Sequence, residues 1–467
     1  MAERSLRIVV VSWHFPPSQE IGGKVVWRLA KHLALLGCDV RVLVAPEAEI
    51  RHRDDKYASV LPPGLRVIPT SVDFDPVGAA LRFFKRLRHR GSAPPMRDSQ
   101  PAAPESSSEP EAPVGQIREF IRALLAFNYH LRWIKPAARR LRQTLAEEPA
   151  DVVLSVSPVF QAHLAVLRAH ADLKGIPWFA WMHDPSAHYF VNTGGLTILG
   201  TNPVGRYLAR RRANWEQKAI ETANRLVVTS QGLADAYIKL LPHLRAPLLV
   251  PCGFDIEEAY RASQHESTRL VFVYVGTIYS QQTPRPIIES LARLRKAGVF
   301  TTNEIEVKFV GRLENEEGRL LMSVARDLGL GDVVTSSPQV PHAEALRIIS
   351  DATVGIAMAE QIVTQIPAKM YEYIALRKPV LALADGTTLD LVNENRIGYA
   401  CGRDGLDSAL TALISQWRLD GLAVFEPALE AAARRYDMAN IAKNLLDALR
   451  DEVADAARNV SRAEVPA

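Results

Sequence analysis

The sequence has few cysteines and no long apolar run. Three of its 467 residues are cysteines, Cys38, Cys252 and Cys401, and their wide separation argues against a zinc site or a disulfide framework. No segment reaches the roughly 18 to 20 uncharged apolar residues that a membrane span needs. The first residues lead into a predicted strand without the pattern of a signal peptide. We therefore expect a cytoplasmic protein.

A strong excess of charge of either sign is also absent. The 56 lysines and arginines against 52 acidic residues leave a net charge of +4, which is too small to indicate nucleic acid binding. No recognisable nucleic acid module accompanies these charges, so we expect no such partner. A chain of 467 residues is longer than one hydrophobic core usually organises, and we expect two domains.

Alternating strand and helix patterns predict an α/β fold in the first half of the chain. A buried strand at residues 7–12, a loop rich in proline and glycine, a helix at 25–36 and a strand at 40–44 form a βαβ opening, which implies a parallel sheet. Further strands are predicted at 65–68, 152–156, 178–181, 225–229 and 248–250.

The second half repeats this pattern. Its predicted strands are at residues 270–276, 306–311, 333–335, 354–359 and 380–383, and its predicted helices are at 285–297, 317–328, 343–349 and 440–449. Two doubly wound parallel sheets follow, and two such halves facing each other would form a cleft between the domains.

The region between the third and fourth strands breaks the pattern. Residues 91–115 contain six prolines and no aromatic residue, so we expect a disordered insert. An amphipathic basic helix is predicted at about 116–146, with a kink expected at Pro136. Together with the basic and aromatic run at 82–90, the arginines and lysines of 118–142 suit anionic lipid headgroups. The alternative is a helix that packs on its own domain and exposes a solvated cationic face.

Residues 366–379 carry the most informative motif. Lys369 and Glu372 stand three residues apart on a short helix that is predicted to begin at the carboxyl edge of the sheet, with Pro367 in its first turn. There Lys369 and the free amides of the helix start would attract a phosphate. Glu372 lies on the same face and can accept hydrogen bonds from two hydroxyls of a ribose. The alternative is an exposed helical ion pair between the two side chains.

This segment resembles the nucleotide-sugar motif of glycosyltransferase family 4, the retaining enzymes of GT-B architecture, in a variant that runs Ile-Pro-x-Lys-x-x-Glu-Tyr. The resemblance covers most of the chain outside residues 91–115 and the extreme C-terminus. It implies an N-terminal Rossmann-like acceptor domain at 1–255, a C-terminal nucleotide-sugar-binding domain at 256–430, and a last helix and tail at 431–467 that cross back to the first domain.

The resemblance also implies the activity. The implied activity is that of a hexosyltransferase, which moves a sugar from a nucleotide-diphosphate sugar to a lipid-linked or polysaccharide acceptor. This reaction would serve the synthesis of a bacterial surface polysaccharide. The diphosphate helps to take the proton of the acceptor, so that neither a metal nor a cofactor is required. Such an enzyme would work in the cytoplasm, on the inner face of the cell membrane.

Four residues of the first half are assigned to the site by the same resemblance. Gly22 and Gly23 lie in the predicted first strand-to-helix loop, where two glycines let the backbone approach a ligand closely, and the family places its glycine-rich loop near the donor diphosphate and the acceptor. His183 and Asp184 follow a predicted strand at the carboxyl edge, and in the family this strand end reaches the transferred sugar.

The second half supplies the remaining donor-binding residues. Gly276 and Thr277 match the glycine-ended strand that faces the phosphates, and Gln339 and Val340 match the segment that contacts the base. Where many relatives carry an arginine and a lysine, this chain has Gln281 and Gln282, so that Arg285 is the nearest cation. The family usually has two acidic residues eight positions apart. In this chain Thr364 stands at the first of these positions and Glu372 at the second. With Lys369, Glu372 and Pro367, these residues complete the predicted donor site.

Three other functions compete with the transferase, and the sequence bears on each of them. A nucleotide-sugar epimerase can share this architecture, but it needs acid and base groups around the sugar, for which the sequence offers His183 and Asp184. A catalytically weak nucleotide-sugar binding protein is suggested by Gln281 and Gln282. A nicotinamide dehydrogenase is disfavoured because no Gly-x-Gly-x-x-Gly follows the first strand.

Overall fold

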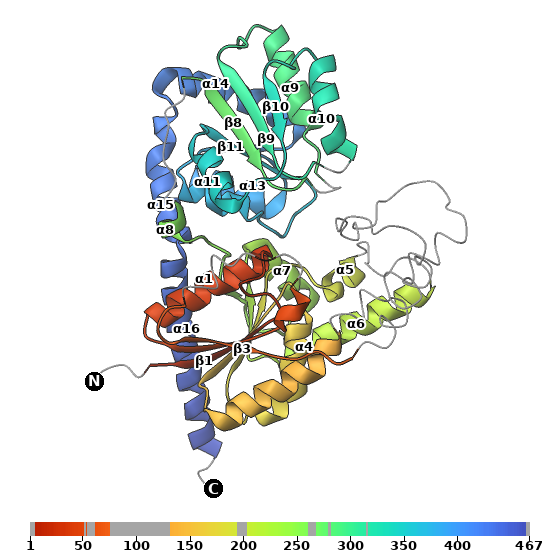
Figure 1. Cartoon of the computed structure of the whole chain (residues 1–467), viewed down its shortest axis with the longest axis vertical. Helices are drawn as coiled ribbons and strands as arrows, with labels where there is room; N and C mark the ends of the chain where they lie inside the picture. The colour runs from red at the N-terminus through yellow and green to blue at the C-terminus, as the bar shows by residue number, and fades with distance from the viewer. Residues whose placement is uncertain are drawn as a thin grey trace, which may run out of the picture. The chain divides into compact units, whose positions relative to one another are not determined.

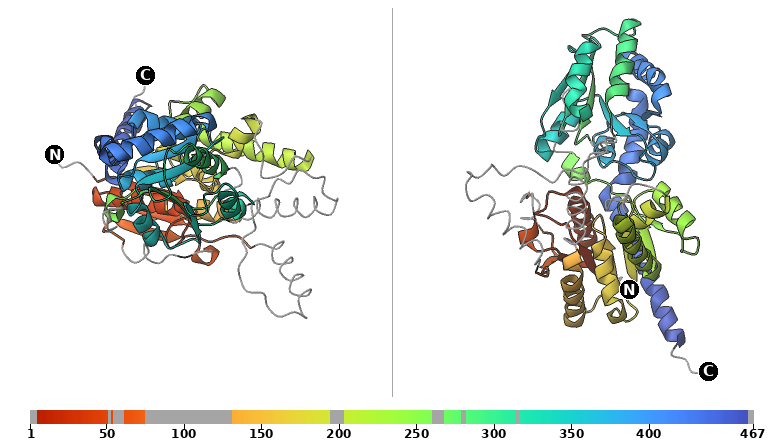
Figure 2. Two further views of the ribbon diagram at one scale, coloured as in Figure 1. Left: turned by 90° about the horizontal axis from the view of Figure 1, so that it is seen from above. Right: turned by 90° about the vertical axis from the view of Figure 1, so that its right-hand side faces the viewer.

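The chain forms two compact units. The computed structural model describes residues 5–50, 53, 61–74, 131–193, 203–259, 268–278, 282–313 and 316–463. Unit 1 comprises Met1–Val227, Tyr237–Pro247 and Ala448–Ala467, and unit 2 comprises Val228–Ala236 and Leu248–Asp447. Each unit contains a buried sheet with helices around it (Figures 1 and 2).

The first sheet has seven strands in the order β3-β2-β1-β4-β5-β6-β7. The central strand β1 pairs in parallel with β2 and with β4, and the residues of both neighbours are almost entirely buried. Helices cover both faces of such a sheet, so its strands are continuous apolar runs. For this reason the strand positions predicted from the sequence lie close to those observed. The strands are β1 (Arg7–Ser12), β2 (Asp39–Val44), β3 (Leu65–Pro69), β4 (Val152–Val156), β5 (Trp178–Met182), β6 (Arg225–Val228) and β7 (Leu248–Leu249).

Helices and short 3₁₀ turns connect these strands. The helices are α1 (Ile21–Leu35), α4 (Gln161–Ala169), α5 (Ala187–Thr193), α6 (Pro203–Thr222) and α7 (Gln231–Leu240), and the 3₁₀ turns are η1 (Glu47–Glu49) and η2 (His170–Asp172). Helix α1 begins four residues before the start predicted at residue 25. This difference places the two glycines of the predicted loop inside the helix.

Residues 131–147 are helical, as predicted for the end of the amphipathic segment, and the helix continues through Pro136. Its apolar face is turned inward, because Trp133, Ala137 and Leu141 are fully buried. Arg142 donates to the Asp172 carboxylate at 2.5 Å on the outer side. The predicted insert at 91–115, the basic run at 82–90 and the helix before residue 131 lie outside the described residues.

The second sheet has six strands in the order β10-β9-β8-β11-β12-β13, and they pair in parallel. The order reverses between β8 and β11, which in open α/β sheets marks the edge where ligands bind. The strands are β8 (Leu270–Val275), β9 (Ile305–Val310), β10 (Val334–Ser337), β11 (Val354–Ala359), β12 (Val380–Ala384) and β13 (Gly398–Cys401).

Helices surround this sheet, and α16, the longest of the described helices, continues from Ala448 into unit 1 (Figure 1). They are α8 (Ile256–Ala259), α9 (Arg285–Lys296), α10 (Glu316–Asp327), α11 (His342–Ser350), α12 (Lys369–Ala375), α13 (Gly386–Asn395), α14 (Leu406–Asp420), α15 (Glu426–Tyr436) and α16 (Met438–Ala463), with 3₁₀ turns η3 (Arg403–Gly405) and η4 (Ala423–Phe425). Within the ranges that the structure describes, no helix combines the length and apolar character needed to span a membrane.

Candidate active site

A tyrosine anchors the short helix α12 to the second sheet. Tyr373 is fully buried, and its hydroxyl donates to the carbonyl oxygen of Ile356 at 3.0 Å. Gly355 of β11 makes room for this ring, because a Cβ atom at that position would lie 2.5 Å from it. With one face of α12 packed inward in this way, Lys369 and Glu372 remain half-buried on the other face.

Lys369 lies against the end of β8. Its Nζ atom is 3.3 Å from the centroid of the Tyr274 ring, a cation–π contact, and 3.3 Å from the position that a Cβ atom on Gly276 would take. Burial lowers the pKa of Lys369 to about 7, although the nearby Glu372 carboxylate raises it. The amine is therefore held beside the glycine that the sequence assigned to the phosphates.

Glu372 has a different partner. Its Oε1 atom lies 3.8 Å from Nδ1 of His342, and Nε2 of His342 lies 3.7 Å from Oε2 of Glu258. The three side chains, from α8, α11 and α12, are between 15% and 19% exposed. Lys369 thus contacts Tyr274 and Glu372 contacts His342, and the two side chains do not form the exposed ion pair that the sequence left as the alternative.

The start of α12 differs from its prediction. The helix begins at Lys369, so Pro367 precedes it and does not occupy its first turn. The amides of Met370 and Tyr371 donate to the carbonyl oxygens of Pro367 and Ala368 at 2.9 and 3.1 Å. These amides are therefore not available to a phosphate, and the Lys369 side chain carries the positive charge at this position.

The loops after β8 and β9 touch through two glycines. Gly276 and Gly311 have φ angles of +137° and +146°, which favour glycine, and a Cβ atom on Gly311 would lie 2.0 Å from the carbonyl oxygen of Gly276. The carbonyl oxygen of Thr277 accepts a hydrogen bond from the Tyr274 hydroxyl at 2.8 Å. Gly276 and Thr277 are thus fixed beside Lys369, and Gly311 is a neighbour that was not singled out from the sequence.

Gln282 does not face this edge. Its side chain is buried, accepts a hydrogen bond from the Tyr274 hydroxyl at 3.1 Å and donates to the carbonyl oxygen of Met358 at 2.9 Å. Gln282 therefore stabilises the loop rather than replacing a basic ligand, and Gln281 lies outside the described residues. Arg285, the first residue of α9, is 43% exposed and lies 4.0 Å from the Glu289 carboxylate.

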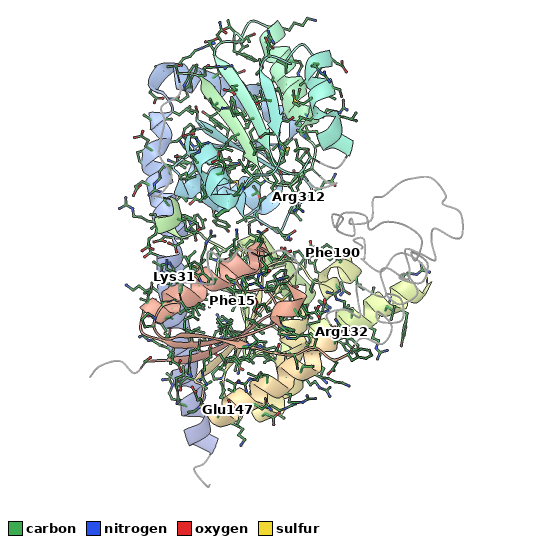
Figure 3. The ribbon with its side chains drawn as sticks, viewed as in Figure 1. Phe15, Lys31, Arg132, Glu147, Phe190 and Arg312 are labelled. Carbon is green, nitrogen blue, oxygen red and sulfur yellow. The ribbon has the colours of Figure 1, made fainter. Side chains whose placement is uncertain are left out.

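Gln339 and Val340 follow β10 at the same edge of the sheet. Gln339 is exposed, and its Oε1 atom accepts a hydrogen bond from Nε of Arg312 at 2.5 Å. Arg312 directly follows Gly311 at the end of β9 (Figure 3). Arg312 and His342 are residues of this edge that sequence reasoning missed. A scan for polar residues just beyond each strand of the second sheet would have found Arg312.

In unit 1, the two predicted glycines belong to the first turn of α1 and not to a loop. A Cβ atom on Gly22 would lie 2.6 Å from Cδ of Pro158, and one on Gly23 would lie 3.1 Å from the backbone nitrogen of Phe15. The absence of side chains therefore lets α1 approach the loops after β1 and β4. Close packing of α1 on these loops therefore explains why glycine occupies positions 22 and 23.

His183 and Asp184 follow β5, as predicted. The amide of His183 donates to Oγ of Ser157 at 2.8 Å, and its ring meets Trp181 edge to face, with centroids 4.4 Å apart. Burial lowers the pKa of His183 to about 3, so the imidazole is neutral at pH 7. Asp184 is half-buried. Ser157 and Pro158 both follow β4. Ser157 bonds to His183 and Pro158 packs on Gly22, so the end of this strand contacts both His183 and the start of α1.

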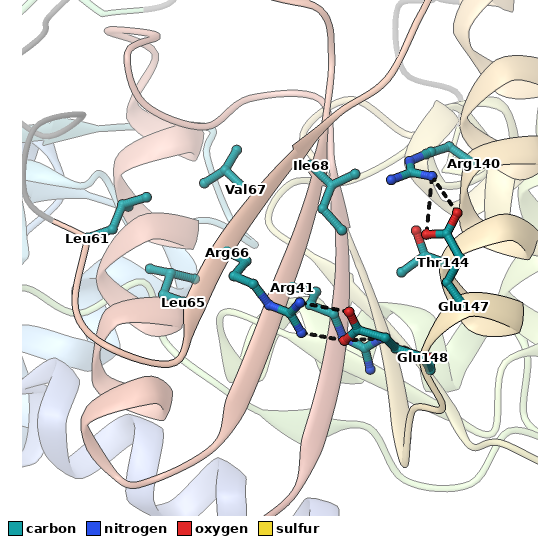
Figure 4. Close-up of a pocket in the computed structure, with 10 residues that line it drawn as sticks. All are labelled: Arg41, Leu61, Leu65, Arg66, Val67, Ile68, Arg140, Thr144, Glu147 and Glu148. Atoms are coloured by element: carbon teal, nitrogen blue, oxygen red, sulfur yellow. Dashed lines mark hydrogen bonds and ion pairs between the residues drawn. The ribbon is translucent and has the colours of Figure 1, made fainter.

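A cavity of about 460 Å³ lies against the edge strand β3 (Figure 4). Arg41 donates to the carbonyl oxygens of Glu148 and Pro149 at 2.9 and 2.7 Å, and Arg66 makes two hydrogen bonds to the Glu148 carboxylate at 2.8 and 2.5 Å. Because the charges that line it are already paired with one another, we assign this cavity a structural role. In the part of the chain that is described, no three His, Cys, Asp or Glu side chains form a metal site.

Two family models match the chain. Residues 99–258 match a family model described as Glycosyltransferase Family 4, and residues 255–444 match one described as Glycosyl transferases group 1. No curated protein matches the sequence.

Among solved structures, the chain is similar to the sucrose-phosphate synthase of Thermosynechococcus elongatus, with 14% identity and a TM-score of 0.61 over 96% of this chain and 100% of that one. It is similar to Anabaena HepE in complex with UDP and glucose, with 14% identity and a TM-score of 0.59 over 96% and 100%. It is also similar to WaaG, a glycosyltransferase involved in lipopolysaccharide biosynthesis, with 13% identity and a TM-score of 0.54 over 95% and 99%.

Two Rossmann-like parallel sheets, of seven and six strands, together with these structural likenesses define a GT-B fold, which confirms the fold class predicted from the sequence. The matches to glycosyltransferase models over residues 99–258 and 255–444 then identify the chain as a glycosyltransferase.

Proposed function

We propose that the chain transfers a hexosyl group from a nucleotide-diphosphate sugar, with retention of configuration, to a lipid-linked or polysaccharide acceptor. The transfer takes place in the cytoplasm, at the inner face of the cell membrane, in the synthesis of a bacterial surface polysaccharide. The observation that carries this proposal is the shared face of α12, on which Lys369 stands beside Gly276 and Glu372 stands beside His342.

The donor is bound by unit 2 in this proposal. Glu372 accepts hydrogen bonds from the ribose hydroxyls, and Lys369 attracts the diphosphate next to the backbone of Gly276 and Thr277. Gln339 and Val340 contact the base. The similarity to HepE, which was crystallised with UDP and with UDP-glucose, supports a nucleotide sugar as the donor.

The residues of unit 1 hold the sugar and the acceptor. His183, buried and neutral, suits hydrogen bonding to the sugar better than proton transfer, since a general acid or base works best when its pKa is near the working pH. Asp184 follows it, and Gly22 and Gly23 lie near the acceptor. A diphosphate oxygen takes the proton of the attacking hydroxyl. The weak basicity of His183 also argues against an epimerase.

Membrane association rests on the basic residues of 82–90 and 118–142. The described helix at 131–147 buries its apolar face in its own unit, so it would contribute charge rather than apolar contacts. Sedimentation with vesicles that contain anionic lipid, compared with neutral vesicles, tests this part of the proposal. Equal amounts bound to both would contradict it.

The activity is tested by thermal shift with uridine, guanosine and adenosine diphosphate sugars, followed by product analysis with the best ligand. A transferase slowly releases free sugar and nucleoside diphosphate from the donor without acceptor. An epimerase would yield an isomer of the donor, and a binding protein would yield no product. Either of these two results would refute the proposed transferase activity.

A further inference from the structure

The proposed donor site needs more positive charge than Lys369 alone provides. A departing nucleoside diphosphate gains negative charge as the glycosidic bond breaks, and preorganised cations stabilise that charge. The second cation predicted from the sequence is Arg285. Its guanidinium is 43% exposed and its charge is opposed by Glu289 at 4.0 Å.

The backbone around Arg312 makes two contacts with the segment that begins at the phosphate-facing glycine. It follows Gly311, whose Cα packs so tightly on Gly276 that a Cβ atom would meet the Gly276 carbonyl oxygen at 2.0 Å. The carbonyl oxygen of Arg312 also accepts a hydrogen bond from the amide of Ile278 at 3.1 Å. Arg312 is therefore fixed directly beside the segment from Gly276 to Ile278.

The side chain of Arg312 is held by a neutral partner. Its Nε atom donates to the amide oxygen of Gln339 at 2.5 Å, which orients the guanidinium without adding a negative charge. Among the described residues, no carboxylate pairs with Arg312. A guanidinium held through Nε keeps the two terminal nitrogens for a phosphate, which it can bind through two hydrogen bonds.

The order of the strands places these groups in a row. Since β10, β9 and β8 are neighbours in this order, Gln339, Arg312 and Gly276 follow one another along the carboxyl edge of the second sheet, and Figure 3 shows Arg312 at this end of the strands. The row runs from the segment proposed for the base to the glycine proposed for the phosphates.

We propose that Arg312 binds the diphosphate of the donor and that Gln339 positions its guanidinium. This assignment rests on the proposed function. It makes a residue at the end of β9 the second cation of the donor site besides Lys369, and it gives Gln339 a second task besides contact with the base.

The test compares a nucleoside diphosphate with its nucleoside. Binding of UDP and of uridine is measured by calorimetry for the wild type and for Arg312→Gln. If guanosine or adenosine diphosphate binds better than UDP, that diphosphate and its nucleoside are used instead. We expect the affinity for the diphosphate to fall roughly tenfold to hundredfold, since hydrogen bonds between charged groups are lost. The affinity for the nucleoside should not change.

Three further variants sharpen the result. Arg312→Lys keeps a charge but loses the planar fork and should fall between the wild type and Arg312→Gln, and it also serves if Arg312→Gln does not fold. Gln339→Ala should weaken diphosphate binding less than Arg312→Gln. Arg326→Gln removes an exposed arginine of α10 that donates to the Met322 carbonyl of its own helix, and it should bind like the wild type.

The outcomes separate the two proposals. If the wild type binds no nucleoside diphosphate, the proposed function fails and the assignment of Arg312 fails with it. If the wild type binds but Arg312→Gln binds equally well, or loses diphosphate and nucleoside to the same extent, only the assignment of Arg312 is overturned.

Discussion

Nδ1 of His342 lies 3.8 Å from Oε1 of Glu372, and on its other side Nε2 of the same ring lies 3.7 Å from Oε2 of Glu258. The imidazole therefore stands between two carboxylates that are carried by different helices. A ring nitrogen that carries a proton can hold the Glu372 carboxylate in one orientation, with its remaining lone pairs available to a ribose. His342 is in this sense a positioning residue of the proposed donor site.

Replacement of His342 by leucine should weaken nucleoside diphosphate binding roughly threefold to tenfold, which is the order of magnitude of one polar contact between partly buried side chains. His342→Gln, which keeps an N–H group facing Glu372, should recover part of the loss. Titration calorimetry with UDP measures both. If the leucine and glutamine variants bind equally, the contact with Glu372 has no positioning role.

Glu372→Ala should reduce donor affinity by roughly a hundredfold or more, because two hydrogen bonds to a charged acceptor are lost. The preference for UDP over 2′-deoxy-UDP should disappear with it. Glu344→Ala is the matched control, since Glu344 is bonded to Arg347 on α11. The thermal midpoint should stay close to that of the wild type, and an unchanged affinity would refute the ribose role of Glu372.

Lys369 should make diphosphate binding depend on pH. Its pKa of about 7 in the free protein rises when a diphosphate binds beside it, because an opposite charge favours the ammonium form. Binding therefore takes up a proton above pH 7, and the affinity should fall by up to about tenfold for each pH unit. The terminal phosphate itself is ionised above about pH 6 and adds little.

Lys369→Arg provides the comparison for this pH dependence. A guanidinium stays charged throughout the range, so its binding curve should be flat from pH 7 to 9. Calorimetry in two buffers of different ionisation enthalpy measures the proton uptake directly. Parallel curves for lysine and arginine would show that Lys369 is already fully charged in the free protein.

The strands could be predicted from the sequence because buried parallel strands are continuous apolar runs, and their limits depend little on the rest of the fold. The start of α1 could not. Gly22 and Gly23 disfavour a helix by intrinsic propensity, yet the helix includes both because only glycine fits against Pro158 and the loop after β1. Here tertiary packing overrides local preference.

The candidate site was predictable in part for a related reason. Lys369 and Glu372 are neighbours along one helix, so their spacing alone places them on one face. Their actual partners, Tyr274 of β8 and His342 of α11, lie far away in the sequence, so these contacts depend on strand order and on side-chain direction. Arg312 was missed for the same reason, since its closeness to Gly276 is a product of the pairing of β8 with β9.

Two buried histidines of unit 1 should make the protein sensitive to acid. Burial lowers the pKa of His163 and that of His183 to about 3, and repulsion from His183 adds to the lowering for His163. Both groups bind a proton more readily in the unfolded chain, near pH 6.5. Their contribution to stability is therefore complete above pH 6.5 and is lost as the pH falls, by about 2 kcal/mol for each histidine at pH 5.

His163→Asn tests this expectation, because it removes the titrating ring but keeps a polar atom near Oγ of Ser155, which lies 2.7 Å from Nδ1 of His163. The variant should be less stable than the wild type at pH 7, since it leaves a cavity. Its free energy of unfolding, measured with urea from pH 7 to pH 5, should fall less steeply, by up to about 1.4 kcal/mol for each pH unit. Equal slopes for the two proteins would mean that His163 takes up its proton at the same pH in the folded and in the unfolded chain, as it would if water reached its ring.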